Sequence, residues 1–254
     1  MRFEIQRADF WKRISAFLFD IMMIGVIVII VMTGLSAIFK YDDHVATVET
    51  LEKEYAEKYN IIQDISQEQW DALTEEEKAR YYECDEARMS DPRLVKAYGM
   101  LSSLKFALPS VSILIAYIIL ELVVPIFFKN GQTLGKKAFG LGVIHTNGVR
   151  IHGQAHFIRS IIGKCLIETL VPFYFLAMIM GGSLGPLLGL IMLALLLILQ
   201  IIAVASTKTR SAIHDLIADA VVVDLASQMT FENADELMAY KTRIHEEEAN
   251  KAEY

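Results

Sequence analysis

Four long apolar runs separate the polar segments of this 254-residue chain and predict four membrane-spanning helices. A helix needs about 20 mostly apolar residues to cross a hydrocarbon core that is roughly 30 Å thick. The last run, residues 165–206, is about twice too long for one span, and GGSLGP at 181–186 divides it because Gly-Gly and Gly-Pro pairs favour a turn. We therefore expect a tight hairpin there, and an all-α membrane protein with spans at about 14–39, 106–128, 165–181 and 186–206.

The polar segment between the first two spans, residues 41–104, has the pattern of short soluble helices. Ser66 and Thr74 are each followed three residues later by Gln or Glu, which is the capping-box signature of a helix start. Asp91-Pro92 favours another helix start, from which a helix would run into the second span. We expect either a small helical hairpin outside the membrane or a solvated insertion.

The polar segment after the second span predicts a small β element. GQTLGKK at 131–137 begins a short amphipathic stretch whose lysines suit the level of the lipid headgroups. LGVIH and VRI flank Thr-Asn-Gly, and an Asn-Gly pair is a strong signal for a two-stranded hairpin. AVVVD at 220–224 is β-branched and would supply a third strand. Such a sheet would tie the middle of the chain to its end.

Composition supports a membrane protein, and charge predicts its orientation. Hydrophobic residues form 54% of the chain, and the mean hydropathy is +0.38. The first thirteen residues hold four Lys or Arg, and 129–164 holds six with no Asp or Glu, whereas 41–104 holds sixteen acidic and seven basic residues. Because basic short loops stay in the cytoplasm, we expect both termini and the β element to be cytoplasmic and 41–104 to be extracytoplasmic. Residues 226–254 would form an acidic cytoplasmic tail.

Three motifs together resemble the RDD family of bacterial membrane proteins. They are Arg13 with Asp20 in the first span, GQTLGKKAFGLGVIHTNG after the second span, and TRSAIHDLIADAVVVD after the last. The family is named for one arginine and two aspartates, which match Arg13, Asp20 and Asp215. The resemblance implies an RDD-type membrane domain at 7–225, interrupted by the acidic insertion, in a multi-pass protein of the cell membrane. For some members of the family, cation/proton exchange has been proposed.

Three carboxylates are expected inside the membrane toward the same leaflet: Asp20, Glu121 and Glu168. An unpaired Asp at bilayer depth costs about 3 kcal/mol, so these side chains should face the protein interior. Like charges raise one another's pKa, which favours a bound proton that a monovalent cation can displace. We therefore predict a site for protons and monovalent cations. The supporting residues are Arg159, His214, Gly131, Gly135 and Lys136.

A structural role for the same charges is the alternative. Asp20 would then pair with Arg159, with Lys164 or with backbone amides of the cytoplasmic segment, and Asp215 would pair with Arg13 or Arg210. Ion pairs of this kind lock helices together and need no substrate. The protein would be a membrane scaffold whose acidic insertion and acidic tail recruit partners.

Enzymatic activity, a cofactor and a metal centre are not expected. GQTLGKK has three residues between its glycines rather than the four of a phosphate-binding loop, and Cys84 and Cys165 lie far apart in sequence. His152 and His156 have a spacing known from metal ligands, but no carboxylate accompanies them, so we expect solvated histidines. The expected partners are the lipid bilayer and a second copy of the chain in a homodimer. Nucleic acid is not among them.

Overall fold

The chain forms two compact units in the computed structural model, which describes residues 5–6, 8–128, 131–180 and 186–252. One unit comprises Met1–Val28 with Ile113–Tyr254, and the other comprises Ile29–Ser112. Among the described residues, four helices are long and apolar enough to cross a membrane, which confirms the prediction of a helical protein with four spans. These helices are Phe10–Ile38, Pro92–Phe128, Gly153–Met180 and Pro186–Ser206.

Two of the spans contain π-helical segments. The second span consists of α5 (Pro92–Tyr117), η1 (Ile118–Val123) and α6 (Val124–Phe128). The third consists of α8 (Gly153–Phe157), η2 (Ile158–Leu170) and α9 (Val171–Met180). The segments η1 and η2 are the π-helical parts. Turns of this kind are rare in proteins overall, but many of those that occur lie at functional sites. Both segments carry most of the charged side chains that these two spans bury.

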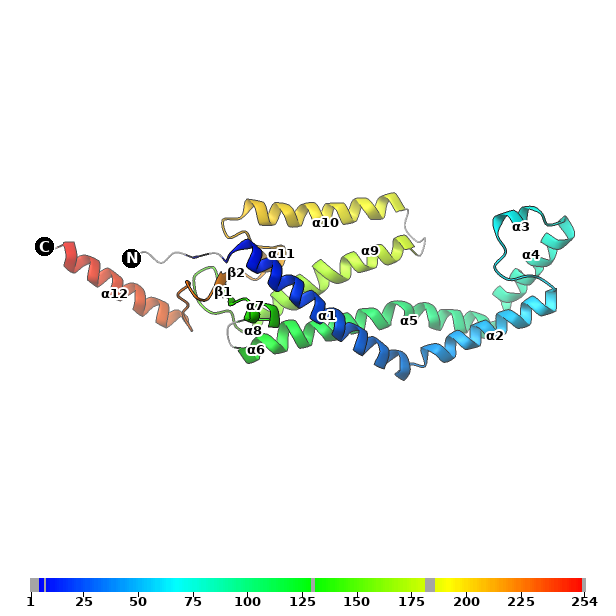
Figure 1. Cartoon of the computed structure of the whole chain (residues 1–254), viewed down its shortest axis with the longest axis horizontal. Helices are drawn as coiled ribbons and strands as arrows, with labels where there is room; N and C mark the ends of the chain where they lie inside the picture. The colour runs from blue at the N-terminus through cyan, green and yellow to red at the C-terminus, as the bar shows by residue number, and fades with distance from the viewer. Residues whose placement is uncertain (1–4, 7, 129–130, 181–185, 253–254) are drawn as a thin grey trace. The chain divides into compact units, whose positions relative to one another are not determined.

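The other two spans are continuous α-helices. They are α1 (Phe10–Ile38) and α10 (Pro186–Ser206), and α10 runs beside α9 (Figure 1). The third span begins at Gly153, twelve residues before the predicted start at 165. The prediction left out the polar residues before 165 because charged side chains are unfavourable in lipid. In the structure, Arg159 and Lys164 are buried against protein, so the helix includes them. The predicted hairpin at 181–186 falls mainly on 181–185, which lie outside the described residues.

The unit Ile29–Ser112 contains the expected helices of the acidic insertion. These are α2 (Tyr41–Tyr59), α3 (Gln67–Asp71) and α4 (Glu75–Ser90), with α2 packed against α4. Both predicted capping boxes are present: Ser66 caps α3, and Thr74 caps α4. The helix start predicted at Asp91-Pro92 is also confirmed, since α5 begins there. The buried side chains Val48, Leu51 and Cys84 hold α2 and α4 together.

A two-stranded sheet forms in the other unit from two of the three expected strands, LGVIH and AVVVD, whereas VRI does not form a strand of it. Strand β1 (Leu141–His145) pairs antiparallel with β2 (Ala220–Asp224). The predicted turn does form, because the His145 amide donates to the Val149 carbonyl, yet VRI joins β1 only through a bridge between Ile144 and Arg150. The strand β2 is favoured because its first four residues are all buried, whereas Arg150 in VRI stays partly exposed.

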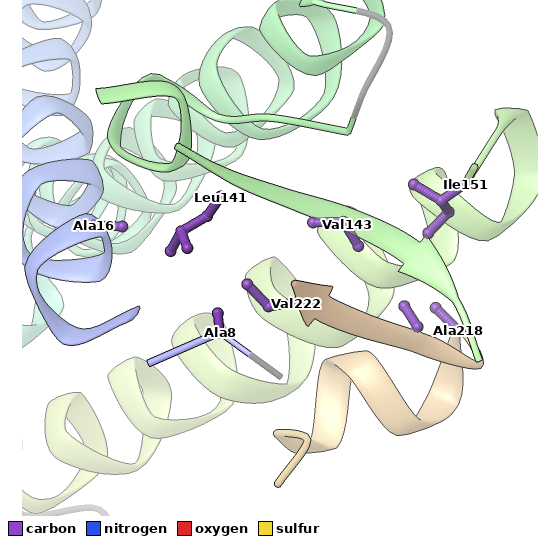
Figure 2. Packing of buried hydrophobic residues seen from close by; sticks show 8 residues of the cluster. Ala8, Ala16, Leu141, Val143, Ile151, Ala218 and Val222 are labelled. Atoms are coloured by element: carbon purple, nitrogen blue, oxygen red, sulfur yellow. The ribbon is translucent and has the colours of Figure 1, made fainter. Parts of the chain in front are cut away.

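The sheet packs against the first turns of α1 through small and branched apolar side chains. Figure 2 shows this cluster, in which Ala8 and Ala16 meet Leu141, Val143 and Val222. Because alanine side chains are short, the backbone of α1 lies close to the sheet. Three shorter helices complete the unit: α7 (Leu134–Ala138) before β1, α11 (Ile213–Ile217) before β2, and α12 (Ala234–Ala252) at the C-terminal end.

Replacing Thr74 by Ala should loosen the start of α4 without unfolding the chain. The Thr74 hydroxyl accepts a hydrogen bond from the Glu77 amide, and loss of such a cap costs about 1 kcal/mol. Amide hydrogen exchange in the first turn of α4 should therefore rise about fivefold. The control is Thr50→Ala, whose hydroxyl donates to Ala46 inside α2 and caps nothing. Equal exchange in both variants would contradict the capping role.

Candidate functional site

Asp20 is held by the first turn of α7. The Thr133 hydroxyl donates to Asp20 Oδ2 over 2.5 Å, and the Gly135 amide donates to Oδ1 over 2.7 Å. The Lys136 ammonium lies 3.8 Å from Oδ2 and 3.2 Å from the Thr133 hydroxyl oxygen. Asp20 thus bonds to a backbone amide, which was one of its expected partners. Its cationic neighbour is Lys136 rather than Arg159 or Lys164.

The sequence TLGK explains why α7 can approach α1 so closely. Thr133 is the N-cap of α7 and accepts a hydrogen bond from the Lys136 amide. A Cβ atom at Gly135 would lie 2.2 Å from the Ala16 carbonyl oxygen and 2.9 Å from Asp20 Oδ1, which only glycine avoids. Gly131 has a φ of +61°, which favours glycine, and therefore serves the turn before α7. Of the two predicted glycines, Gly135 alone meets Asp20.

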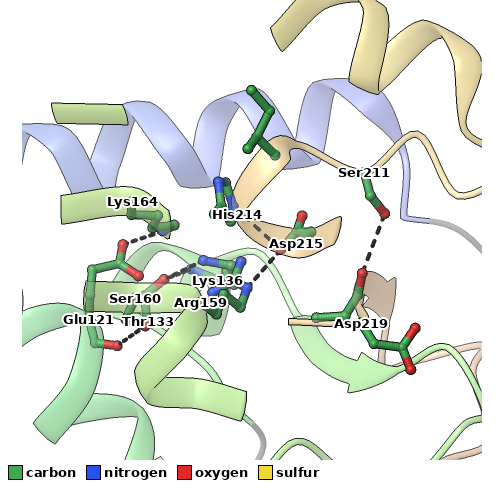
Figure 3. Close-up of polar contacts among 12 residues, drawn as sticks. Glu121, Thr133, Lys136, Arg159, Ser160, Lys164, Ser211, His214, Asp215 and Asp219 are labelled. Atoms are coloured by element: carbon green, nitrogen blue, oxygen red, sulfur yellow. Dashed lines mark hydrogen bonds and ion pairs between the residues drawn. The ribbon is translucent and has the colours of Figure 1, made fainter. Parts of the chain in front are cut away.

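Glu121 lies in η1 and forms an ion pair with η2. The Lys164 ammonium lies 2.6 Å from Glu121 Oε1, and the Ser160 hydroxyl donates to the Glu121 backbone carbonyl over 2.7 Å (Figure 3). Glu121 is 1% exposed, and its Oε2 atom is buried with no hydrogen-bond partner among the described residues. The π-helical segments therefore place Glu121 of the second span next to Lys164 of the third, and one oxygen of Glu121 has no hydrogen-bond partner among the described residues.

Lys136 is a buried cation beside Asp20, and its pKa lies close to neutral pH. Burial lowers the pKa of Lys136 to about 7, Lys164 contributes to that decrease, and Glu121 and Asp20 oppose it. The Lys136 ammonium thus interacts electrostatically with Asp20 and Glu121, two of the three predicted carboxylates. A proton can leave Lys136 near neutral pH, which changes the charge beside Asp20 and Glu121 by one unit.

Asp215 belongs to a second group of charges. Arg159 Nε lies 2.7 Å from Asp215 Oδ1, and both side chains are 1% exposed (Figure 3). Arg13 lies 3.9 Å from Asp215 Oδ2 and donates to the Arg210 carbonyl over 3.0 Å. Burial opposes ionisation of Asp215, but Arg159 and then His214 outweigh it and hold its pKa below the usual range. This group joins α1, η2 and α11 through two arginines that share the Asp215 carboxylate, and Arg159 Nη1 has no hydrogen-bond partner among the described residues.

Glu168 joins this second group through His214. His214 Nδ1 lies 2.7 Å from Glu168 Oε2, the His214 amide donates to Glu168 Oε1, and His214 Nε2 lies 3.4 Å from Asp215 Oδ1. Burial lowers the pKa of His214, although Asp215 and Glu168 raise it. The close approach depends on Gly163, since a Cβ there would lie 2.5 Å from His214 Cβ. The three predicted carboxylates thus fall into two groups, with Glu168 apart from Asp20 and Glu121.

Sequence reasoning missed two residues and misplaced a third. Thr133 was not singled out, although a threonine before LGK is an N-cap signal, and Ser160 has no signal in the sequence. His156 was expected to be solvated but is 4% exposed, and neither of its ring nitrogens has a partner among the described residues. The side chain is covered because α8 extends the third span into the protein.

Within the described part of the chain, no group of three His, Cys, Asp or Glu residues could hold a metal ion.

Comparison with known proteins gives one match. The sequence model of the RDD family matches residues 7–219, which is most of the chain. No curated protein and no solved structure matches it.

The Arg159–Asp215 pair should contribute to stability only while both charges are present. Arg159→Met removes the nearest partner of the buried Asp215, and Asp215→Leu removes that of Arg159, which costs about 3–5 kcal/mol of unfolding free energy. The double variant should lose less than either single variant, because it removes both members of the buried pair and leaves only the partly exposed Arg13 without its more distant partner. Denaturant unfolding in detergent micelles measures this. As a control, Lys12→Met breaks a solvent-exposed pair with Asp224 and should cost far less than either single variant.

Lys136 should give the protein a distinctive pH dependence. Lysine titrates near pH 10.4 in an unfolded chain and near 7 here, so between these values the unfolded state binds a proton that the folded state lacks. The unfolding free energy of the wild type, relative to Lys136→Met, should therefore rise from pH 7 to pH 10 and stay flat below about pH 6. Unfolding curves across this range test the effect. The control, Arg243→Met, removes a cation that does not titrate in this range.

Proposed function

We propose, from the premise that this chain belongs to the RDD family, that it exchanges monovalent cations for protons across the cell membrane. Family membership and four apolar helices make it a multi-pass membrane protein. The basic connections support an orientation with both termini in the cytoplasm. The protein is then a transporter rather than an enzyme, and its partners are lipid, protons and monovalent cations.

The observation that carries this proposal is the buried Lys136 ammonium beside Asp20. When Lys136 is protonated, its charge balances the carboxylate at 3.8 Å. When Lys136 loses its proton, Asp20 lacks a balancing charge, and a monovalent cation can take the place of the ammonium. Asp20 and Thr133 offer the hard oxygen ligands that such an ion prefers, and Glu121 Oε2 has no other partner among the described residues. Reprotonation of Lys136 then expels the ion, so that one cation exchanges for one proton.

The group around Asp215 has a different role in this proposal. Arg159, Asp215 and Arg13 are joined by charges that stay paired through the cycle, and the pKa of Asp215 lies well away from neutral pH. This group keeps α1, η2 and α11 together while the charge on Lys136 changes. Glu168, bound to His214, belongs to that support rather than to the path of the ion.

The alternative is a membrane scaffold, and one observation favours it. Asp20, Glu121 and Glu168 each accept a hydrogen bond from within the chain, so none of them needs a substrate to be stable. In that case the acidic insertion and the tail recruit partners. Four spans make a small transporter, so an exchanger of this size would be expected to form a homodimer. A scaffold is also compatible with a homodimer.

Proton flux in proteoliposomes tests the exchanger. With an imposed pH gradient, adding Na⁺, K⁺ or Li⁺ should change the internal pH for the wild type. Lys136→Met and Asp20→Asn should each reduce this flux at least about tenfold, because one balanced charge of the exchange site is gone. The matched control is Asp224→Asn, which removes a carboxylate paired with Lys12 and should keep at least half of the flux.

Two outcomes would contradict the exchanger. One is full flux in both site variants, which would remove Asp20 and Lys136 from the path. The other is no flux in well-folded wild type with any of the three cations, which would support the scaffold. The scaffold predicts in addition that deleting residues 41–104 abolishes recruitment while Asp20→Asn leaves it unchanged.

A further inference from the structure

A cavity of about 430 Å³ lies where the second span ends and the third begins. Its lining includes Ile126 at the end of α6, His156 on α8, and Arg150 and Glu232 from the segments around the sheet. Volumes of this size are typical of small-ligand sites. Because two membrane-spanning helices have their ends here, the cavity is at the depth expected for lipid headgroups.

Two side chains that line the cavity have buried nitrogens without a partner. Both ring nitrogens of His156 are buried and lack a hydrogen-bond partner among the described residues. The Arg150 Nε atom is also buried and unpartnered among them, while Nη1 donates to Glu232 Oε1 over 2.7 Å. An unsatisfied buried nitrogen costs about 1–3 kcal/mol, so native proteins seldom leave several of them together. A ligand with acceptor oxygens would accept hydrogen bonds from one ring N–H of His156 and from Arg150 Nε.

The start of the third span adds a preference for negative charge. The helix Gly153–Met180 is 28 residues long, and its first residue lines the cavity. His152 occupies the N-cap position in an extended conformation but makes no side-chain cap hydrogen bond. The amides of the first turn and the helix dipole therefore favour an anion at this end. The carboxylate of Glu232 competes for Arg150, but its side chain is 69% exposed and lies toward solvent.

We propose that this cavity binds a phosphate group. His156 and Arg150 donate hydrogen bonds to its oxygens, and the first turn of α8 contributes amides and the positive end of the helix dipole. The phosphate belongs to the headgroup of an anionic membrane lipid or to a small soluble phosphate compound. Basic pockets between membrane-spanning helices bind anionic headgroups in this manner. The site is distinct from that of the proposed exchange of cations, because neither Asp20 nor Lys136 lines the cavity.

Thermal unfolding of the full chain in nanodiscs tests the proposal. One arm compares phosphatidylcholine discs with discs that contain phosphatidylglycerol, and the other adds inorganic phosphate to phosphatidylcholine discs, with chloride at equal ionic strength as reference. Saturating a site at about 100 times its Kd should raise the unfolding midpoint by roughly 5 °C. A rise with phosphatidylglycerol alone assigns the lipid headgroup, and a rise with inorganic phosphate assigns a soluble phosphate compound.

Two variants with opposite effects separate binding from folding. Arg150→Gln should abolish most of the rise, because it removes a donor, whereas Glu232→Gln should enlarge it, because it frees Arg150 from its competing carboxylate. Arg243→Gln is the control, since Arg243 is an exposed arginine of α12 and should keep the wild-type rise. The proposal is wrong if neither arm raises the wild-type midpoint, or if Arg150→Gln keeps the full rise. Should Arg150→Gln fail to fold, a rise for Glu232→Gln no larger than that of the wild type overturns the proposal.

Discussion

An aspartate on an apolar membrane-spanning helix is tolerated only where the protein replaces the hydrogen bonds of water. Asp20 receives this replacement from Thr133, Gly135 and Lys136 at the start of α7, and the sheet follows α7 directly. The position of α7 against α1 therefore determines where β1 begins, and through β1 where β2 and α11 lie. The need to supply hydrogen bonds to Asp20 thus determines where α7, the sheet and α11 lie in this unit.

The π-helical segments extend the same constraint to the second and third spans. A π-helix bonds residue i to i+5, which changes the direction of side chains relative to an α-helix. In η1 and η2 this places Glu121, Arg159 and Lys164 inside the protein, where each finds an opposite charge. The cost of burying these charges is offset by pairing rather than by solvent, which couples the two spans to each other and to α11.

The spans, the capping boxes and the helix start at Asp91-Pro92 were predictable because each depends on residues near one another in sequence. The pairing of β1 with β2 joins residues about 80 positions apart, and local pattern instead favoured the hairpin across Asn147-Gly148. The contacts of the carboxylates were hard to predict for the same reason, because they join residues that are far apart in sequence. That each carboxylate lies on a candidate span could be read from the sequence, whereas the pairing of Glu168 with His214 depends on long-range packing.

The two charge groups differ in how tightly they are paired, and this difference supports different roles. Arg159 and Asp215 meet at 2.7 Å with a charge-assisted hydrogen bond, so separating them would leave two buried ions unsolvated. Lys136 stands 3.8 Å from Asp20, and Asp20 also accepts hydrogen bonds from the Thr133 hydroxyl and the Gly135 amide. Because these two donors are uncharged, we expect a change of charge at Lys136 to leave the packing of α7 against α1 intact. The fold can tolerate a movable cation at this position because backbone and hydroxyl donors, rather than the cation, hold the aspartate.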